Sequence, residues 1–356
     1  MSMLTNVSLW TVIVLLLGAA AVPGAAQAEA VTTGLTTLMV DETVDLANHI
    51  LAHIDVAGSP ASNFDPDYVE SMAQRRAELG LEPGLAGDLT AFRKEAPKHM
   101  ALWNVAMAAA FFESTPSYLA ALWTWAGREN VDISGFSQQD QMVLQGLGAA
   151  FAQVPKEPIM AVAHASQLEY ESFYSQYWPA TEEQRLVHLQ RLAQLWTDAD
   201  QEFLESFFSQ RGVQSIRIIA SEAMLRNGRG FTDKAPGRMG VIVSLPASDA
   251  EAMDSYLLAI HELLHAITDP LVYEAMGWSP ADRSLDPSDA AGYAIHEAIE
   301  NAVIRFQLWL LQGMAAEKTD AYFAFFNVTS EEQLAEEFPV PDAVLTRLEH
   351  LRQATL

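Results

Sequence analysis

The sequence predicts a mostly α-helical protein of the α+β class, and three observations support this class. From residue 36 to about residue 212, apolar residues recur at the three- and four-residue spacing of amphipathic helices. β-Branched runs typical of strands begin after Gly212. Half of the 356 residues are apolar and 9% are aromatic, which is enough for a sizeable buried core. We find no fixed repeat period and therefore expect no solenoid.

The first 28 residues are predicted to be a signal peptide. Residues 9–22 form an apolar run, and Ala26-Gln27-Ala28 provides a small-x-small cleavage pattern. The run is short for a membrane span, which needs about 20 apolar residues. We expect cleavage near Ala28 and export to the periplasm or beyond, with no stable membrane span. No Lys or Arg precedes the run, so a mis-set start codon and an uncleaved anchor are the alternatives.

Residues 29–211 are predicted to form a helical domain. Prolines separate its apolar segments, and Thr115-Pro116 is typical of a helix start, with Thr115 as the N-cap. The helices are expected over residues 44–54, 100–112, 117–126, 139–153, 159–177 and 181–210.

Residues 212–356 are predicted to form a second, catalytic domain with a small sheet. Residues 214–220 and 239–245 are rich in Ile and Val and predict two buried strands, and Asn227-Gly228 between them favours a tight turn. No Gly/Ser-rich linker separates the two domains, so we place their boundary where the helical pattern gives way to β-branched runs.

A long helix after these strands carries the residues that indicate chemistry. Ser248 and Glu251 form a capping box at its start, and we expect it to end before Pro270. The helix contains His261-Glu262-Leu-Leu-His265. Four residues are little more than one turn, so the two imidazoles share a face, with backbones about 6 Å apart. They can bind one Zn²⁺, while Glu262, roughly 100° around the helix, can act as general base beside a metal-bound water.

A catalytic zinc site needs a third protein ligand and leaves one position for water. Asp286-Pro287 predicts the start of a second long helix that ends at Gly313. On this helix Glu297 and Glu300 qualify as carboxylate ligands, and His296 qualifies as an imidazole ligand. The alternative interpretation of His261 and His265 is that they are two ordinary helix histidines, one of them packed in a core.

The His-Glu-x-x-His pattern followed by a helical Glu resembles the gluzincin metallopeptidases, the thermolysin-like clan, over about residues 214–312. The resemblance implies that Glu297 is the third ligand and that Asn301 orients His261, at the position where the family has Asp. Three features depart from the family pattern: the gap of 32 residues from His265 to Glu297, the Asn at 301 and the His at 296. Glu300 therefore stays open as the third ligand.

The resemblance implies a zinc metallopeptidase that hydrolyses peptide or protein substrates, with one Zn²⁺ and with Glu262 as general base. It also implies an oxyanion donor, for which Tyr293 and Tyr273 are candidates; packing is the alternative for both. The second hypothesis is an exported helical binding or assembly protein whose zinc site is structural, with His296 as a fourth ligand, or degenerate. A third is hydrolysis of another amide or ester bond.

Composition excludes several other classes of function. The 46 acidic and 20 basic residues give a formal charge of −26, which repels phosphate backbones, so we expect no nucleic-acid partner. The absence of cysteine excludes disulfides, thiolate nucleophiles and Cys-ligated zinc. Five of the basic residues lie between Arg217 and Arg238, which predicts either a basic wall of the cleft or a solvated loop.

Overall fold

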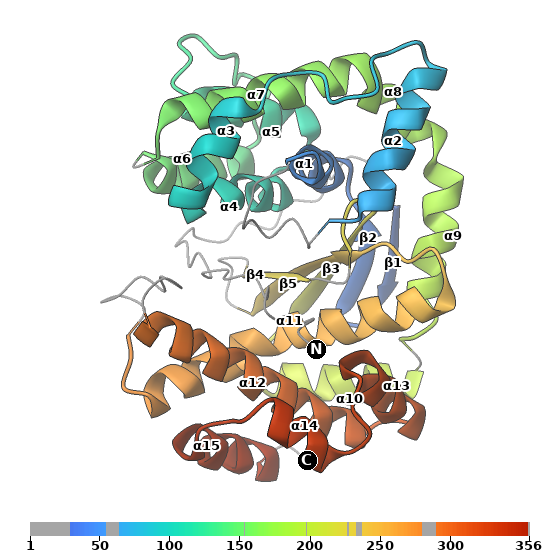
Figure 1. Ribbon diagram of the computed structural model, residues 1–356, viewed down its shortest axis with the longest axis vertical. Coiled ribbons are helices and arrows are strands. Elements are labelled where there is room, and N and C mark those ends of the chain that lie inside the picture. Colours follow the sequence, from blue (N-terminus) through green and yellow to red (C-terminus); the bar gives the residue numbers. More distant parts are fainter. Residues whose placement is uncertain are drawn as a thin grey trace.

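A mixed β-sheet with helices on both faces organises the computed structural model (Figure 1). The structure describes residues 29–54, 64–152, 154–196, 198–225, 228–232, 237–279 and 290–354. The predicted signal peptide and the predicted helix start at Asp286-Pro287 lie outside the described residues. The predicted class, mostly helical with a small sheet, is confirmed.

The sheet has five strands in the order β1-β2-β3-β5-β4. Its three central strands, β2, β3 and β5, run parallel, while β1 and β4 pair antiparallel at the two edges. The strands are β1 (Glu29–Thr33), β2 (Thr36–Val40), β3 (Ser215–Ser221), β4 (Arg229–Thr232) and β5 (Arg238–Ser244).

Strands β3 and β5 match the two predicted strands, whereas β1, β2 and β4 were not predicted. The helical interpretation from residue 36 was wrong at β2, where Leu38 and Val40 point to one face of the sheet and Met39 to the other. Because β2 pairs with β3, the sheet takes strands from both sides of the predicted boundary at residues 211/212. The two predicted domains therefore share one sheet.

Alternate side chains of the sheet enter two hydrophobic cores, as expected for strands covered on both faces. Ile219 and Ile242 pack into the core of what we call the upper layer, and Ile218 and Val241 pack into the core of the lower layer. The upper layer comprises α1 (Glu42–Ala52), α2 (Pro66–Glu78), α3 (Thr90–Glu95), α4 (Met100–Ala108), α5 (Thr115–Trp125), α6 (Gln138–Phe151), α7 (Lys156–Glu169) and α8 (Ser175–Ala180).

The lower layer comprises α10 (Asp198–Ser209), α11 (Asp249–Ala275), α12 (Ala290–Gln312), α13 (Ala316–Phe326), α14 (Glu331–Glu337) and α15 (Asp342–Gln353). Helix α9 (Glu182–Ala193) passes the β1 edge of the sheet and connects the two layers (Figure 1). Its Leu189 and Leu192 lie in the lower core, although the sequence analysis assigned them to the N-terminal domain. Among the described residues, no helix combines the length and the apolarity needed to cross a membrane.

Side-chain caps explain the starts of α5 and α11, with two differences from prediction. Ser114, one residue before the predicted Thr115, is the N-cap of α5. Ser248 caps α11 as predicted, and the Glu251 carboxylate accepts from the backbone N–H of Ala247 at 2.7 Å. Helix α11 does not end before Pro270 but continues to Ala275. Burial of Val272 in the lower core offsets the hydrogen bond that proline cannot donate.

Buried polar groups join α1 to the carboxyl end of β3. The Asp45 carboxylate accepts from the backbone N–H of Glu222 at 2.7 Å and from the Tyr174 hydroxyl at 2.6 Å. Tyr177 donates to the Glu222 carboxylate at 2.8 Å. The two acidic side chains thus meet beneath the upper layer, and each is held by a tyrosine of the segment after α7.

Candidate metal centre

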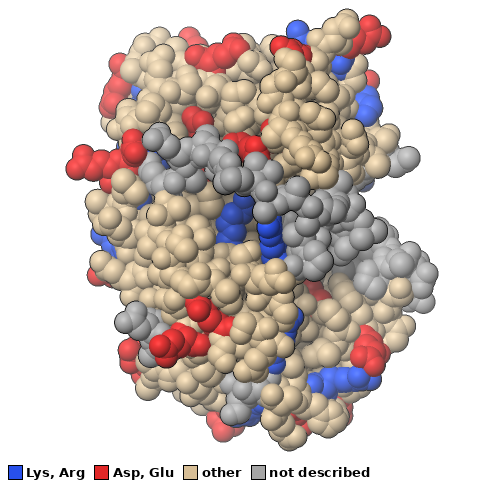
Figure 2. All heavy atoms as spheres, turned by 180° about the vertical axis from the view of Figure 1, so that it is seen from behind, with Lys and Arg blue, Asp and Glu red and all other residues tan. Residues whose placement is uncertain are grey.

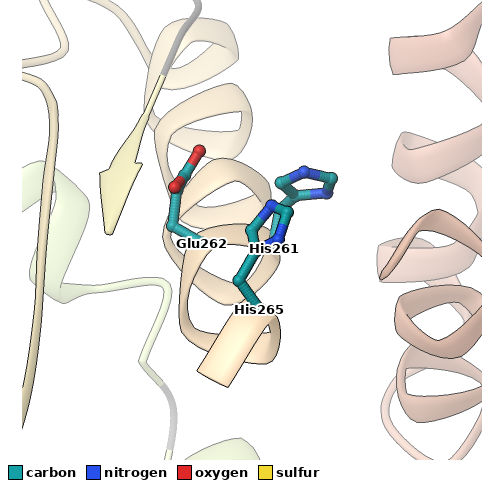
Figure 3. A group of neighbouring side chains, drawn as sticks. All are labelled: His261, Glu262 and His265. Atoms are coloured by element: carbon teal, nitrogen blue, oxygen red, sulfur yellow. The ribbon is translucent and has the colours of Figure 1, made fainter. Parts of the chain in front are cut away.

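Helix α11 lies along the lower face of the sheet and presents its histidines and Glu262 in different directions. Figure 3 shows His261 and His265 on the same side of the helix, while Glu262 points toward a strand on the other side. One potential ligand atom from each of the three side chains can be chosen so that all lie within 4.8 Å of one another. The predicted one-turn stacking of the two imidazoles is present, with ring centroids 5.0 Å apart.

Glu300 of α12 meets both imidazoles from the neighbouring helix. Its Oε2 lies 3.2 Å from Nε2 of His261, and its Oε1 lies 3.8 Å from Nε2 of His265. Glu297, which the family resemblance implies as third ligand, has an exposed side chain. The geometry therefore favours Glu300, the alternative from the sequence, over Glu297.

Packing of α12 on α11 decides between these two glutamates. Gln307 donates to the backbone carbonyl of Leu257 at 2.6 Å, which fixes the face that α12 turns toward α11. Glu300 lies two turns before Gln307 on this face, and His296 lies one turn further. Glu297 is rotated roughly 100° from His296 and turns toward solvent.

His296 adjoins the same cluster. Its Nδ1 lies 3.8 Å from Oε1 of Glu300, and its Nε2 is buried without a hydrogen-bond partner among the described residues. The structure thus places this alternative ligand beside Glu300. In a metal-bound site, His296 would be either a fourth ligand of the ion or a neighbour of the ligand Glu300.

Asp269, which sequence reasoning missed, contacts His265. Its Oδ1 lies 2.9 Å from Nδ1 of His265, one turn further along α11. The four-residue spacing of His261 and His265 repeats from His265 to Asp269, and this repeat is the signal that could have found it. Asn301 does not take the predicted place beside His261, because its amide donates to the carbonyl of Pro339 at 2.9 Å, on another side of α12.

The charges of the cluster are strongly coupled. Burial lowers the pKa of His265, but the carboxylates of Asp269 and Glu300 outweigh it and raise that pKa to about 10. Burial raises the pKa of Glu300, but His265 and the hydrogen bond from His261 outweigh it and lower that pKa to about 2. Without metal, therefore, a protonated His265 lies between two carboxylates, and the cluster stabilises positive charge at this point.

Gly230 of the edge strand and Gly228 just before it allow β4 to approach Glu262. The backbone N–H of Gly230 donates to Oε2 of Glu262 at 2.7 Å. A Cβ added to Gly228 would lie 2.4 Å from Cγ of Glu262, so a side chain at this position would collide with the glutamate. The strand in this way holds the predicted general base beside the two imidazoles, with a carboxylate oxygen within 4.8 Å of a nitrogen of each ring.

The two candidate oxyanion donors differ in their surroundings. Tyr293 is 53% exposed on the surface of α12. Tyr273 packs its ring against Trp278, with centroids 4.9 Å apart, and burial together with Asp269 raises the pKa of its hydroxyl. The surroundings of Tyr273 agree with the packing interpretation, whereas the exposed side chain of Tyr293 does not.

Two of the basic residues before α11, Arg217 and Arg229, serve the packing of the two layers. Arg217 donates to the backbone carbonyl of Ala110, and its guanidinium lies 5.1 Å from the ring centroid of Phe231. Arg229 is 1% exposed and lies over Phe64 at 5.2 Å. Basic side chains are visible at mid-height on the face shown in Figure 2, between more acidic upper and lower parts. Neither Arg217 nor Arg229 thus belongs to a solvated loop.

Comparisons with protein families, with curated proteins and with solved structures gave no match. The gluzincin resemblance stays a prediction, and the function has to be argued from the geometry of this cluster.

Proposed function

We propose that this protein is an exported zinc-dependent peptidase in which His261, His265 and Glu300 hold the metal and Glu262 is the general base. The observation that carries the proposal is the approach of Glu300 to both imidazoles, at 3.2 and 3.8 Å, from a second helix. Two histidines and one glutamate are a ligand set of catalytic zinc sites, which keep the fourth position for water.

The geometry and the charges of the cluster fit a divalent cation. Ligand atoms about 2.0–2.1 Å from a tetrahedral Zn²⁺ lie roughly 3.3 Å apart, close to the separations between Glu300 and the imidazoles. Glu262, Glu300 and Asp269 surround two histidines, so negative charge is in excess. A dication that displaces the proton of His265 would relieve this excess, which is the usual linkage between metal binding and proton release.

Bound zinc would polarise the scissile carbonyl and lower the pKa of its water toward about 7. The chain's own residues contribute position and proton transfer. Glu262, held by the N–H of Gly230, would accept the proton of the attacking water and pass it to the leaving amine.

Strand β4 favours a peptide over another amide or an ester as substrate. It is an antiparallel edge strand beside Glu262, and its outer edge pairs with no other strand among the described residues. An extended peptide can add to such an edge through main-chain hydrogen bonds. The scissile bond would then lie along the strand that positions the general base.

The second candidate is a structural zinc site in a binding or assembly protein, and the position of His296 favours it. Its Nδ1, 3.8 Å from Glu300, is within reach of a fourth ligand position. The substitution His296→Ala distinguishes the structural site from the hydrolytic site. A structural site would lose most of its zinc, whereas a hydrolytic site would retain it.

Metal content of the purified mature chain, measured with cleavage of a peptide library, tests the proposal. Glu300→Ala should lower zinc occupancy far below that of Glu297→Ala, the matched control on the same helix. The opposite order would restore Glu297 as third ligand. A wild-type chain that holds zinc but cleaves no peptide would contradict the peptidase and leave the metal site intact.

A further inference from the structure

We infer that Asp269 is a positioning residue that fixes the imidazole of His265 for metal binding; the inference rests on the proposed zinc site. The Asp269 carboxylate is 11% exposed and lies 2.9 Å from Nδ1 of His265. On the opposite side of the same ring, Nε2 faces Glu300 at 3.8 Å. The ring is therefore held at one nitrogen and points the other into the cluster.

This arrangement selects one tautomer of His265. A carboxylate can only accept at Nδ1, so the proton of the neutral ring stays on Nδ1 and the lone pair of Nε2 stays free. A metal needs that lone pair. The negative charge of Asp269 also increases the basicity of the ring, as carboxylate partners of metal-bound histidines do.

Helix formation alone does not explain an aspartate at this position. Asp is an unfavourable residue in a helix interior, and Asp269 is followed by Pro270, which lacks a donor. A buried carboxylate is also costly unless it is paired. Asp269 is 8% exposed overall, and its contact with His265 accounts for its presence there.

The position differs from what the gluzincin resemblance implies. There the orienting residue lies on the second helix and serves the first histidine, which would make it Asn301 acting on His261. Here Asn301 bonds to Pro339, and the acid lies on the first helix and serves the second histidine. The inference therefore comes from the contacts of this chain.

Zinc affinity of three purified full-length chains tests the role: wild type, Asp269→Asn and Asp269→Ala, each titrated with Zn²⁺ against a chromophoric chelator. We expect Asp269→Ala to bind zinc about 10- to 100-fold more weakly. Asp269→Asn should lie between, because its amide oxygen still accepts from Nδ1 but carries no charge. Glu274→Ala is the control, since Glu274 lies on the same helix and pairs with Arg347 instead.

Two further measurements separate this role from others. Thermal unfolding of the metal-free chains shows whether Asp269→Ala merely loosens α11. Zinc affinity of Asp269→Ala equal to that of the wild type, or reduced no more than in Glu274→Ala, would overturn the inference. The peptidase proposal would then still stand. Weakened zinc binding in chains that cleave no peptide would support the inference and reject the peptidase. A wild-type chain that binds no zinc would reject both.

Discussion

At the scale of single residues, neighbouring positions of α11 carry the proposed metal ligands and the proposed general base. His261 and His265 turn toward α12, and Glu262 turns toward β4, where the backbone of Gly230 holds its carboxylate. Their spacing along the helix produces this separation, because consecutive helical residues point about 100° apart. Changes at Glu262 should thus affect hydrolysis without removing the metal.

Glu262→Gln should keep bound zinc and lose hydrolysis of an unstructured protein by about 10²- to 10⁴-fold, the usual contribution of a general base. Metal analysis and a casein-type cleavage assay on the same preparation check this. Glu297→Gln, an exposed glutamate of α12, is the control. Unchanged turnover of Glu262→Gln would remove Glu262 from the mechanism.

Gly228→Ala should slow hydrolysis, because its methyl group would lie 2.4 Å from Cγ of Glu262 and displace either the glutamate or β4. A displacement of this kind can reduce the rate up to about 100-fold. Zinc occupancy should be unaffected, since Glu262 is not one of the three proposed ligands. Gly84→Ala, where an added Cβ meets nothing within 4 Å, should behave as wild type; equal rates for both variants would contradict the proposed contact.

At the scale of secondary-structure elements, Glu222, the residue after β3, couples the contact between β3 and α1 to pH. Burial raises the pKa of Glu222 to about 7, the Asp45 carboxylate adds to the rise, and Tyr177, Arg185 and Arg75 act against it. The folded protein therefore binds this proton more tightly than the unfolded chain does. Its contribution to stability is complete below about pH 4.5 and is lost as the pH rises to about 7.

Glu222→Gln should abolish this part of the pH dependence, because the amide stays neutral. The wild-type free energy of unfolding should fall between pH 4.5 and pH 7, relative to the variant, by on the order of 3 kcal/mol. Urea unfolding of both proteins at the two ends of this range measures the difference. Glu183→Gln, an exposed glutamate of α9, should follow the wild type; parallel curves for Glu222→Gln and wild type would show that the Glu222 proton is not linked to folding.

At the scale of the whole molecule, the sheet lies between the upper and lower layers and contributes side chains to both cores. Strand β2, from before the first helix, pairs with β3 and contributes Leu38 and Val40 to the lower core. Helix α9 adds Leu189 and Leu192 to that core. Helices α11 and α12, which carry the proposed metal ligands, thus depend on segments far earlier in the chain.

A fragment of residues 212–356 should therefore fail to fold by itself, although it contains every proposed metal ligand. Without β2 and α9, one edge of β3 would be unpaired and part of the lower core would face water. Circular dichroism and urea titration of the fragment, beside a chain that begins at Glu29, measure this. A cooperative transition of the fragment would show that the sheet strands from the N-terminal part are dispensable.

The local parts of the fold and of the site could be predicted from the sequence, since they depend on residues one turn apart. The helix periods, the Ser248 cap and the shared face of His261 and His265 are of this kind. Strands β1 and β2 could not, because the short, threonine-rich run before α1 is fixed as a hairpin when β2 pairs with β3, about 180 residues later.

The sequence by itself determined the chemistry that α11 offers, two imidazoles and a carboxylate around one helical turn, because helix geometry sets that spacing wherever the helix lies. It also limited the candidates for a third metal ligand to a few residues of α12. Only the tertiary structure decided among them: the rotation of α12 fixed by its packing on α11 brings Glu300 to the imidazoles and turns Glu297 to solvent. A choice between side chains on one helix depends on which face a neighbouring helix covers, and no local pattern contains that information.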